Sequence, residues 1–143
     1  MKRYLLDTSV LGAGLFRRPM AVEMLTPWLT TGEAATSILV YGELVEYIRG
    51  RTDFEVHREA LRELLREISP FFLTYAILER YAEIRRQMRR PAGPGLIGDV
   101  DTLIAATALE RNLTVVTADS DFERVPGLNV MLVSRQSLEA RLP

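Results

Sequence analysis

The chain has 143 residues and a net charge of −1, contains no cysteine, and is 48% hydrophobic by residue count. This length predicts one domain, residues 1–143, which can bury a core without cross-links. The absence of cysteine excludes disulfides, thiolate metal sites and a cysteine nucleophile. The nearly neutral charge gives no sign of nucleic-acid binding by itself.

Short apolar runs predict strands, and helical patterns separate them along the whole chain. We expect the strands at residues 2–6, 33–37, 70–74, 113–117 and 127–134. Apolar residues at helical spacing, bounded by capping residues, predict helices between the strands. We expect the helices at residues 18–31, 37–50, 53–67, 75–88, 101–111 and 135–143. Two prolines and three glycines place residues 90–98 in a loop.

Strands that alternate with helices predict an α/β fold around a mostly parallel sheet. Ligands of such sheets bind beyond the carboxyl ends of the strands. Asp7 directly follows the first predicted strand, and Asp119 and Asp121 follow the strand at 113–117. These two strands therefore direct acidic side chains toward the edge at which a ligand is expected.

Other acids can join them, since Asp99 and Asp101 open a helix and Glu43 and Glu46 share one helical face. Carboxylates gathered in one place repel one another and cannot all stay ionised without a cation. Hard oxygen ligands select Mg²⁺ or Mn²⁺, and Mg²⁺ leaves room for a phosphate. One or two such ions can activate water and stabilise a leaving oxygen. The residues thus predict an acidic, divalent-metal phosphate site.

Each aspartate also has a structural alternative when it is taken singly. Asp99 or Asp101 can cap the helix that follows, and Asp7 can form an Asx-turn after its strand. The aspartates after the strand at 113–117 can cap a short helix at 120–124. Their coincidence at the strand ends of one sheet favours the metal site, with Asp99 left as the helix cap.

Other chemistries have little support in the sequence. His57 is the only histidine, lies among charged residues and is expected at the surface. Lys2 is the only lysine, which argues against a receiver-type phospho-acceptor domain with its lysine late in the chain. The motif "DVDTL" follows a loop, whereas a haloacid-dehalogenase-type phosphatase requires an apolar strand before it.

Four arginines fall within six positions of a predicted helix end. They form either a solvated helix face or a patch that contacts phosphates, because guanidinium groups match phosphate oxygens. The four are Arg85, Arg86, Arg89 and Arg90.

Several segments together resemble a known family. They are "YLLDTSVL" at 4–11, "TSILVYGEL" at 36–44, "DTLIAATALERNLTVVTADSDF" at 101–122 and "VPGLNV" at 125–130. In this order and spacing the chain resembles PIN-domain ribonucleases, and most closely the VapC-type toxins of toxin–antitoxin pairs. The resemblance implies a three-layer α/β/α domain with a central, mostly parallel sheet of four to five strands.

The resemblance also implies roles for particular residues. The family's catalytic metal ligands fall on Asp7, Glu43, Asp101 and Asp119, and a frequent fifth metal ligand falls on Asp121. Hydroxyls that support the first and fourth acids fall on Ser9 and Thr117. Relatives often carry a basic or polar residue at the position that is Ala118 here.

The implied activity is hydrolysis of RNA phosphodiester bonds with one or two Mg²⁺ or Mn²⁺ ions per site. The implied partners are RNA, a cognate antitoxin protein and a second copy of the chain. Independently of the resemblance, no stretch approaches the ~18 apolar residues that span a bilayer, so we expect no membrane and a cytoplasmic location. The alternative is a catalytically silent PIN-fold module that binds RNA or an antitoxin. Ile48, Phe54 and Leu64 either line a groove for a partner helix or pack on each other, and packing is favoured.

Overall fold

The computed structural model describes residues 1–141, in which four short strands form one parallel sheet. The strands are β1 (Tyr4–Leu6), β2 (Ala34–Ala35), β3 (Thr114–Thr117) and β4 (Val130–Leu132). Their spatial order is β2-β1-β3-β4, and every pairing is parallel. β1 and β3 are adjacent, with Leu5 opposite Val115, so their carboxyl ends meet at one edge.

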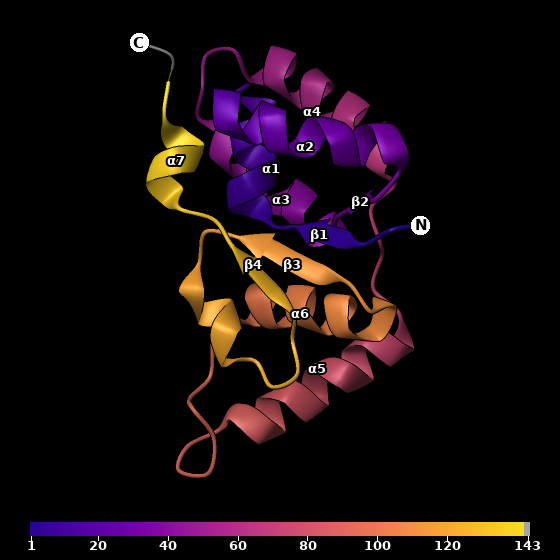
Figure 1. Ribbon diagram of the computed structural model, residues 1–143, viewed down its shortest axis with the longest axis vertical. Helices are drawn as coiled ribbons and strands as arrows, with labels where there is room; N and C mark the ends of the chain where they lie inside the picture. Colours follow the sequence, from indigo (N-terminus) through magenta and orange to yellow (C-terminus); the bar gives the residue numbers. More distant parts are fainter. Residues whose placement is uncertain (142–143) are drawn as a thin grey trace.

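Helices cover both faces of the sheet. They are α1 (Thr8–Leu15), α2 (Pro19–Thr31), α3 (Ile38–Arg49), α4 (Phe54–Ile68), α5 (Tyr75–Met88), α6 (Asp99–Arg111), α7 (Arg135–Glu139) and the 3-10 helix η1 (Ser120–Arg124). Figure 1 shows α1 to α4 above the sheet and α5 and α6 below it. The predicted three-layer α/β/α architecture is confirmed. None of the helices in the described part of the chain has the length and apolar character of a membrane span.

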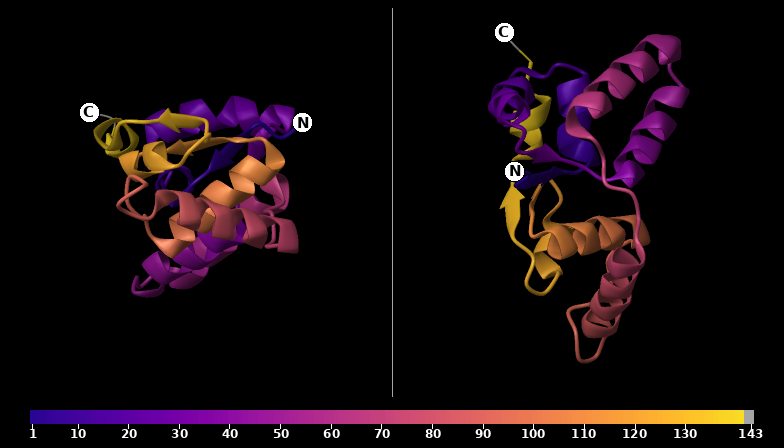
Figure 2. Two further views of the ribbon diagram at one scale, coloured as in Figure 1. Left: turned by 90° about the horizontal axis from the view of Figure 1, so that it is seen from below. Right: turned by 90° about the vertical axis from the view of Figure 1, so that its right-hand side faces the viewer.

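The two central strands are buried on both faces, as parallel strands usually are. Leu5 and Leu6 of β1 are fully buried, and so are Val115 and Val116 of β3. Below them, α6 lies between the sheet and α5, and Figure 2 shows α5 as the outermost helix on that side. This packing fixes the first turn of α6 beside the carboxyl ends of β1 and β3.

One strand prediction is wrong and one helix was missed, while the tail helix predicted at 135–143 ends at Glu139, with residues 142–143 lying outside the described part of the chain. Residues 70–74 form no strand, because only Phe71 makes a bridge, to Ser37, and Pro70 lacks the N–H that a strand ladder needs. Helix α1 was not predicted at all. Its sequence "TSVLGAGL" contains two glycines, which have low helix propensity, and burial of its apolar residues stabilises it instead.

The apolar residues of α3 and α4 pack internally. Ile48 is fully buried, and Phe54 and Leu64 pack against the same core. The favoured alternative, in which these three residues pack rather than line a groove, is confirmed.

Two glycines give opposite predictions for stability. A Cβ atom at Gly12 of α1 would lie 3.1 Å from Leu44 Cδ2 of α3, whereas a Cβ at Gly42 meets nothing within 4 Å. We expect Gly12→Val to lower the free energy of unfolding by about 1–3 kcal/mol, because it overpacks the contact between α1 and α3. Gly42→Ala, the control, is expected to raise it by about 0.5–1 kcal/mol. Urea denaturation measures both, and a Gly12→Val variant as stable as the wild type would contradict the close packing.

Candidate active site

Asp7 lies at the junction of β1 and α1 and is 5% exposed. Its carboxylate caps α1 by accepting a hydrogen bond from the Val10 backbone N–H at 3.2 Å. It also accepts hydrogen bonds from the hydroxyl of Ser9 at 2.6 Å and from the hydroxyl of Thr117. Burial raises the pKa of Asp7, while these hydrogen bonds to its ionised form act in the opposite direction.

The same two hydroxyls connect Asp7 to the end of β3. Ser9 Oγ accepts a hydrogen bond from the Ala118 N–H at 3.2 Å, and Thr117 Oγ1 accepts one from the Asp119 N–H at 2.9 Å. Asp119 Oδ1 in turn accepts from the Asp121 N–H at 2.9 Å, which caps η1. The short helix expected at 120–124 therefore forms, and Asp119 is its N-cap.

Glu43 comes to this edge from α3. It is half-buried and accepts a hydrogen bond from the hydroxyl of Thr8, whereas Glu46, one turn further along, is exposed. Of the two glutamates that share this helical face, the structure thus brings Glu43 beside the end of β1. Sequence reasoning did not find Thr8, although its place next to Asp7 in "DTS" was a usable signal.

Asp101 shows that the acids act on one another. Burial raises its pKa first, and the charges of neighbouring carboxylates raise it further, to about 6. In decreasing order of effect these neighbours are Asp119, Glu43, Asp7 and Asp121. Acids from β1, α3, α6 and the end of β3 therefore lie within electrostatic reach of a single side chain.

The donor set fits a hard divalent cation, although the side chains are not gathered around one point. Within residues 1–141, no three acidic or histidine side chains are arranged so that they could hold one ion as they stand. Their oxygens instead face hydrogen-bond donors: Asp7 faces Ser9 and Thr117, and Glu43 faces Thr8. Carboxylates that repel one another, with oxygen as their only donor atom, are nevertheless the ligand type that Mg²⁺ and Mn²⁺ prefer.

The prediction that Asp99 caps α6 is wrong. Gly98 occupies the N-cap position, and Asp99 is the first residue of the helix, with no capping hydrogen bond. Its exposed carboxylate pairs with Arg85 at 2.7 Å and accepts from the Tyr81 hydroxyl at 3.0 Å. Asp99 therefore ties α6 to α5, and this ion pair also engages Arg85, one of the four clustered arginines.

Two of the four clustered arginines, together with Arg124, border a cavity of about 430 Å³ beside the loop after α5. Its lining is Arg89, Arg90, Gly95, Leu96 and Arg124. Arg124 lies on η1, the helix that Asp119 caps, and donates to the Leu96 carbonyl at 2.8 Å. Sequence reasoning did not find Arg124, because only folding brings η1 to this loop. Arg86 is exposed on α5.

Comparison with protein families matches residues 4–128 to the PIN domain. The chain belongs to the PIN domain family, as the resemblance in its sequence predicted. No match is found among proteins of curated function.

Several solved structures share this fold. VapBC2 from Rickettsia felis, bound to a DNA fragment from its promoter, superposes with a TM-score of 0.80 at 22% identity, covering 92% of this chain and 98% of that chain. DNA-bound VapBC from Salmonella typhimurium gives a TM-score of 0.81 at 20% identity, with the same coverage of 92% and 98%. FitAcB from Neisseria gonorrhoeae superposes with a TM-score of 0.76 at 25% identity, covering 90% of this chain and 96% of that chain.

Replacement of Asp101 gives a prediction that depends on pH. Its folded-state pKa is raised from 3.8 to about 6, so its contribution to stability is full below about pH 4 and is lost as the pH rises through about 6. Asp101→Asn removes this loss. We therefore expect the free energy of unfolding of the metal-free variant to exceed that of the wild type by about 1–2 kcal/mol near pH 7.5. This figure is discounted for the solvent exposure of the side chain. The difference should shrink toward about pH 4.

Urea unfolding in the presence of a chelator, near pH 7.5 and near pH 4, measures this difference. The control is Asp99→Asn, which removes an exposed carboxylate from the same helical turn and breaks its ion pair with Arg85. This control should show no gain near pH 7.5. An Asp101→Asn variant destabilised equally at both pH values would contradict the mutual repulsion of the acids.

Proposed function

We propose that this protein is a divalent-metal-dependent ribonuclease that hydrolyses RNA phosphodiester bonds as the toxin of a toxin–antitoxin pair. The observation that carries the proposal is the raised pKa of Asp101, which reports four other carboxylates around it. Membership of the PIN domain family and structural likeness to VapBC and FitAcB complexes support the same function.

In this proposal four acids hold one or two Mg²⁺ or Mn²⁺ ions, and a fifth assists. The four are Asp7, Glu43, Asp101 and Asp119, and the fifth is Asp121. Such an ion, when bound, lowers the pKa of water and neutralises charge on the phosphate. Ser9 and Thr117 hold the Asp7 carboxylate in place, and Thr8 does the same for Glu43.

The arginines are proposed to position the RNA backbone. Arg86, Arg89 and Arg90 at the end of α5 supply guanidinium groups for phosphates, and Arg124 adds one from η1. Arg85 forms an ion pair with Asp99 and therefore contributes less to binding of the RNA phosphates. In the hydrolysis, the water oxygen bonds to phosphorus and gives up one proton, the bond to the 3′ oxygen breaks, and that leaving oxygen takes up a proton.

The proposed protein partners are an antitoxin and a second copy of the chain. A toxin–antitoxin complex from Klebsiella pneumoniae also shares the fold, with a TM-score of 0.70 at 22% identity over 90% of this chain and 95% of that chain.

An exposed apolar group at the start of α5 offers a surface for the homodimer. It consists of Phe72, Leu73, Tyr75 and Leu78. We place the protein in the cytoplasm, where RNA is available.

The second candidate function is a catalytically silent PIN-fold module that binds RNA or an antitoxin. One observation favours it: the acid oxygens face hydroxyls rather than a common point. A cleavage assay separates the two functions.

The proposed ligands predict a steep loss of activity on substitution. Loss of a residue that merely supports a metal ligand reduces activity about 10- to 100-fold, so Asp7→Asn and Asp101→Asn should reduce RNA cleavage with Mg²⁺ by at least about 100-fold. Glu43→Gln should behave alike, whereas its control Glu46→Gln, exposed on the same helix, should cleave at the wild-type rate. Chelation by EDTA should abolish cleavage, and added Mn²⁺ should restore it.

The readout is the rate of cleavage of labelled single-stranded RNA. Undiminished cleavage by Asp7→Asn or by the wild type in EDTA would refute the metal site. No cleavage by the wild type with either metal would favour the silent module.

A further inference from the structure

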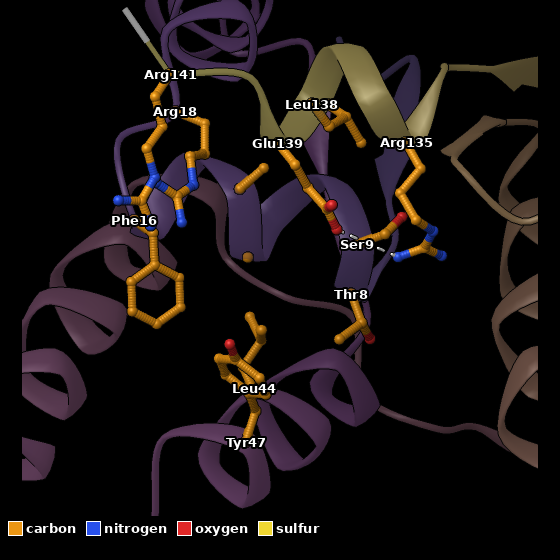
Figure 3. Close-up of a pocket in the computed structure, with 12 residues that line it drawn as sticks. Thr8, Ser9, Phe16, Arg18, Leu44, Tyr47, Arg135, Leu138, Glu139 and Arg141 are labelled. Atoms are coloured by element: carbon orange, nitrogen blue, oxygen red, sulfur yellow. Dashed lines mark ion pairs between the residues drawn. The ribbon is translucent and has the colours of Figure 1, made fainter. Parts of the chain in front are cut away.

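A cavity of about 520 Å³ lies between α1, α3 and α7, separate from the arginine-lined cavity beside the loop after α5. Figure 3 shows Arg18, Arg141 and Phe16 on one side of it, Thr8, Ser9 and Arg135 on the other, and Leu44 and Tyr47 along its lower wall. Cavities of roughly 300–1,000 Å³ accept small ligands, which is a suitable size for one nucleotide.

One wall of the cavity is shared with the acidic site. Thr8 and Ser9 line the cavity, and the same two hydroxyls donate to Glu43 and Asp7. A ligand in the cavity therefore lies one side chain away from two of the proposed metal ligands.

The rim of the cavity is positively charged. Three arginines line it, and Glu139 is the one acid among its lining residues. Arg135 lies 3.8 Å from Glu139, an exposed pair marked in Figure 3, whereas within residues 1–141 Arg18 and Arg141 form no salt bridge. Guanidinium groups that are not shared with a carboxylate favour a phosphate ligand.

The interior of the cavity presents aromatic surface. Tyr47 is 63% exposed, although it is a large aromatic residue, and its ring meets the Phe16 ring edge-on at a centroid distance of 5.8 Å. The guanidinium carbon of Arg51 lies 5.0 Å from the centre of the Phe16 ring and holds that ring from outside the cavity. Unstacked RNA bases bind to such aromatic rings beside arginines.

We propose that this cavity holds one nucleotide of the RNA next to the cleaved bond, with its base against Tyr47 and its phosphate at Arg18 and Arg141. This inference rests on the proposed ribonuclease function and adds a place where the RNA is recognised. An apolar partner helix fits less well, because it would cover guanidinium groups without supplying an acceptor. Arg18 and Arg141 fix the backbone, whereas Tyr47 selects nucleotides that can unstack.

Salt-dependent binding tests the two contacts separately. The probe is a fluorescein-labelled, unstructured RNA oligonucleotide, and fluorescence anisotropy measures its binding to the full chain in EDTA, where metal-dependent cleavage cannot occur. Each phosphate contact on a single strand contributes about 0.7 to the slope of log K against log salt concentration. Because both guanidinium groups are proposed to contact the same phosphate, the Arg18→Gln, Arg141→Gln double variant should weaken binding and reduce that slope by about 0.7.

Tyr47→Ala should weaken binding roughly 5- to 10-fold without a change in slope, because stacking releases no counterions. Tyr47→Phe keeps the ring and should bind like the wild type. Arg66→Gln is the control for charge alone, since Arg66 is exposed on α4 outside the cavity, and it should leave the slope within the range of the wild type. Urea unfolding of each variant excludes loss of the fold.

Affinity and slope unchanged in both the arginine and the Tyr47→Ala variants would overturn the proposal and leave the cavity to a protein partner. Absence of RNA binding by the wild type would overturn it as well. Failure of the ribonuclease function gives a different result: the wild type binds the oligonucleotide in a cavity-dependent manner but does not cleave it when Mg²⁺ is added.

Discussion

The carboxylate of Asp7 joins the carboxyl ends of β1 and β3, and the rest of the site is placed relative to it. It accepts hydrogen bonds from the hydroxyls of Ser9 and Thr117. The same two hydroxyls accept hydrogen bonds from the backbone N–H groups of Ala118 and Asp119, which follow β3. One buried side chain thereby fixes the start of α1, the end of β3 and the entry to η1. Since α1 also carries Thr8, the same junction positions Glu43 of α3.

Hydroxyl partners leave the acids available to a cation, which arginine partners would not do. Within residues 1–141, none of the five clustered acids forms a salt bridge, and no buried side-chain nitrogen or oxygen is left without a hydrogen bond. Asp99 is the contrasting case, because Arg85 neutralises it and it joins two helices. A fold selected only for stability would pair acids in this second way, since repelling carboxylates destabilise the folded state. The carboxylates around Asp101, by contrast, repel one another without an arginine partner.

The sequence predicted those parts of the molecule that depend on local pattern. The strand ends at Asp7 and Asp119 followed from apolar runs and from the rule that parallel strands share one carboxyl edge. The helix predicted at 101–111 ends at its predicted last residue, Arg111, and Asn112 caps it in the left-handed conformation, with φ of 55°. The helix Tyr75–Met88 was predicted with its observed bounds.

What could not be predicted depends on tertiary contacts. Burial of its apolar residues stabilises helix α1, although its two glycines have low helix propensity. The strand expected at 70–74 is reduced to one bridge at Phe71. Asp99 was expected to cap its helix, but the position of Arg85 on the neighbouring helix gave it another partner. Folding brings Arg124 beside the loop after α5, and it brings Arg18 to the same cavity as residues of α7. These residues lie far apart in the chain, so no local sequence pattern predicts that they meet.

The most direct test of the central claim is calorimetric titration of Mn²⁺ into chelator-treated protein, in buffers of different ionisation enthalpy. If the acids converge on a cation, the wild type binds Mn²⁺ and, near pH 6, releases protons, because Asp101 must ionise to bind. Asp101→Asn should then bind more weakly and without that release. Absence of Mn²⁺ binding by the wild type, or binding that Asp101→Asn leaves unchanged, would contradict a metal site at the ends of β1 and β3.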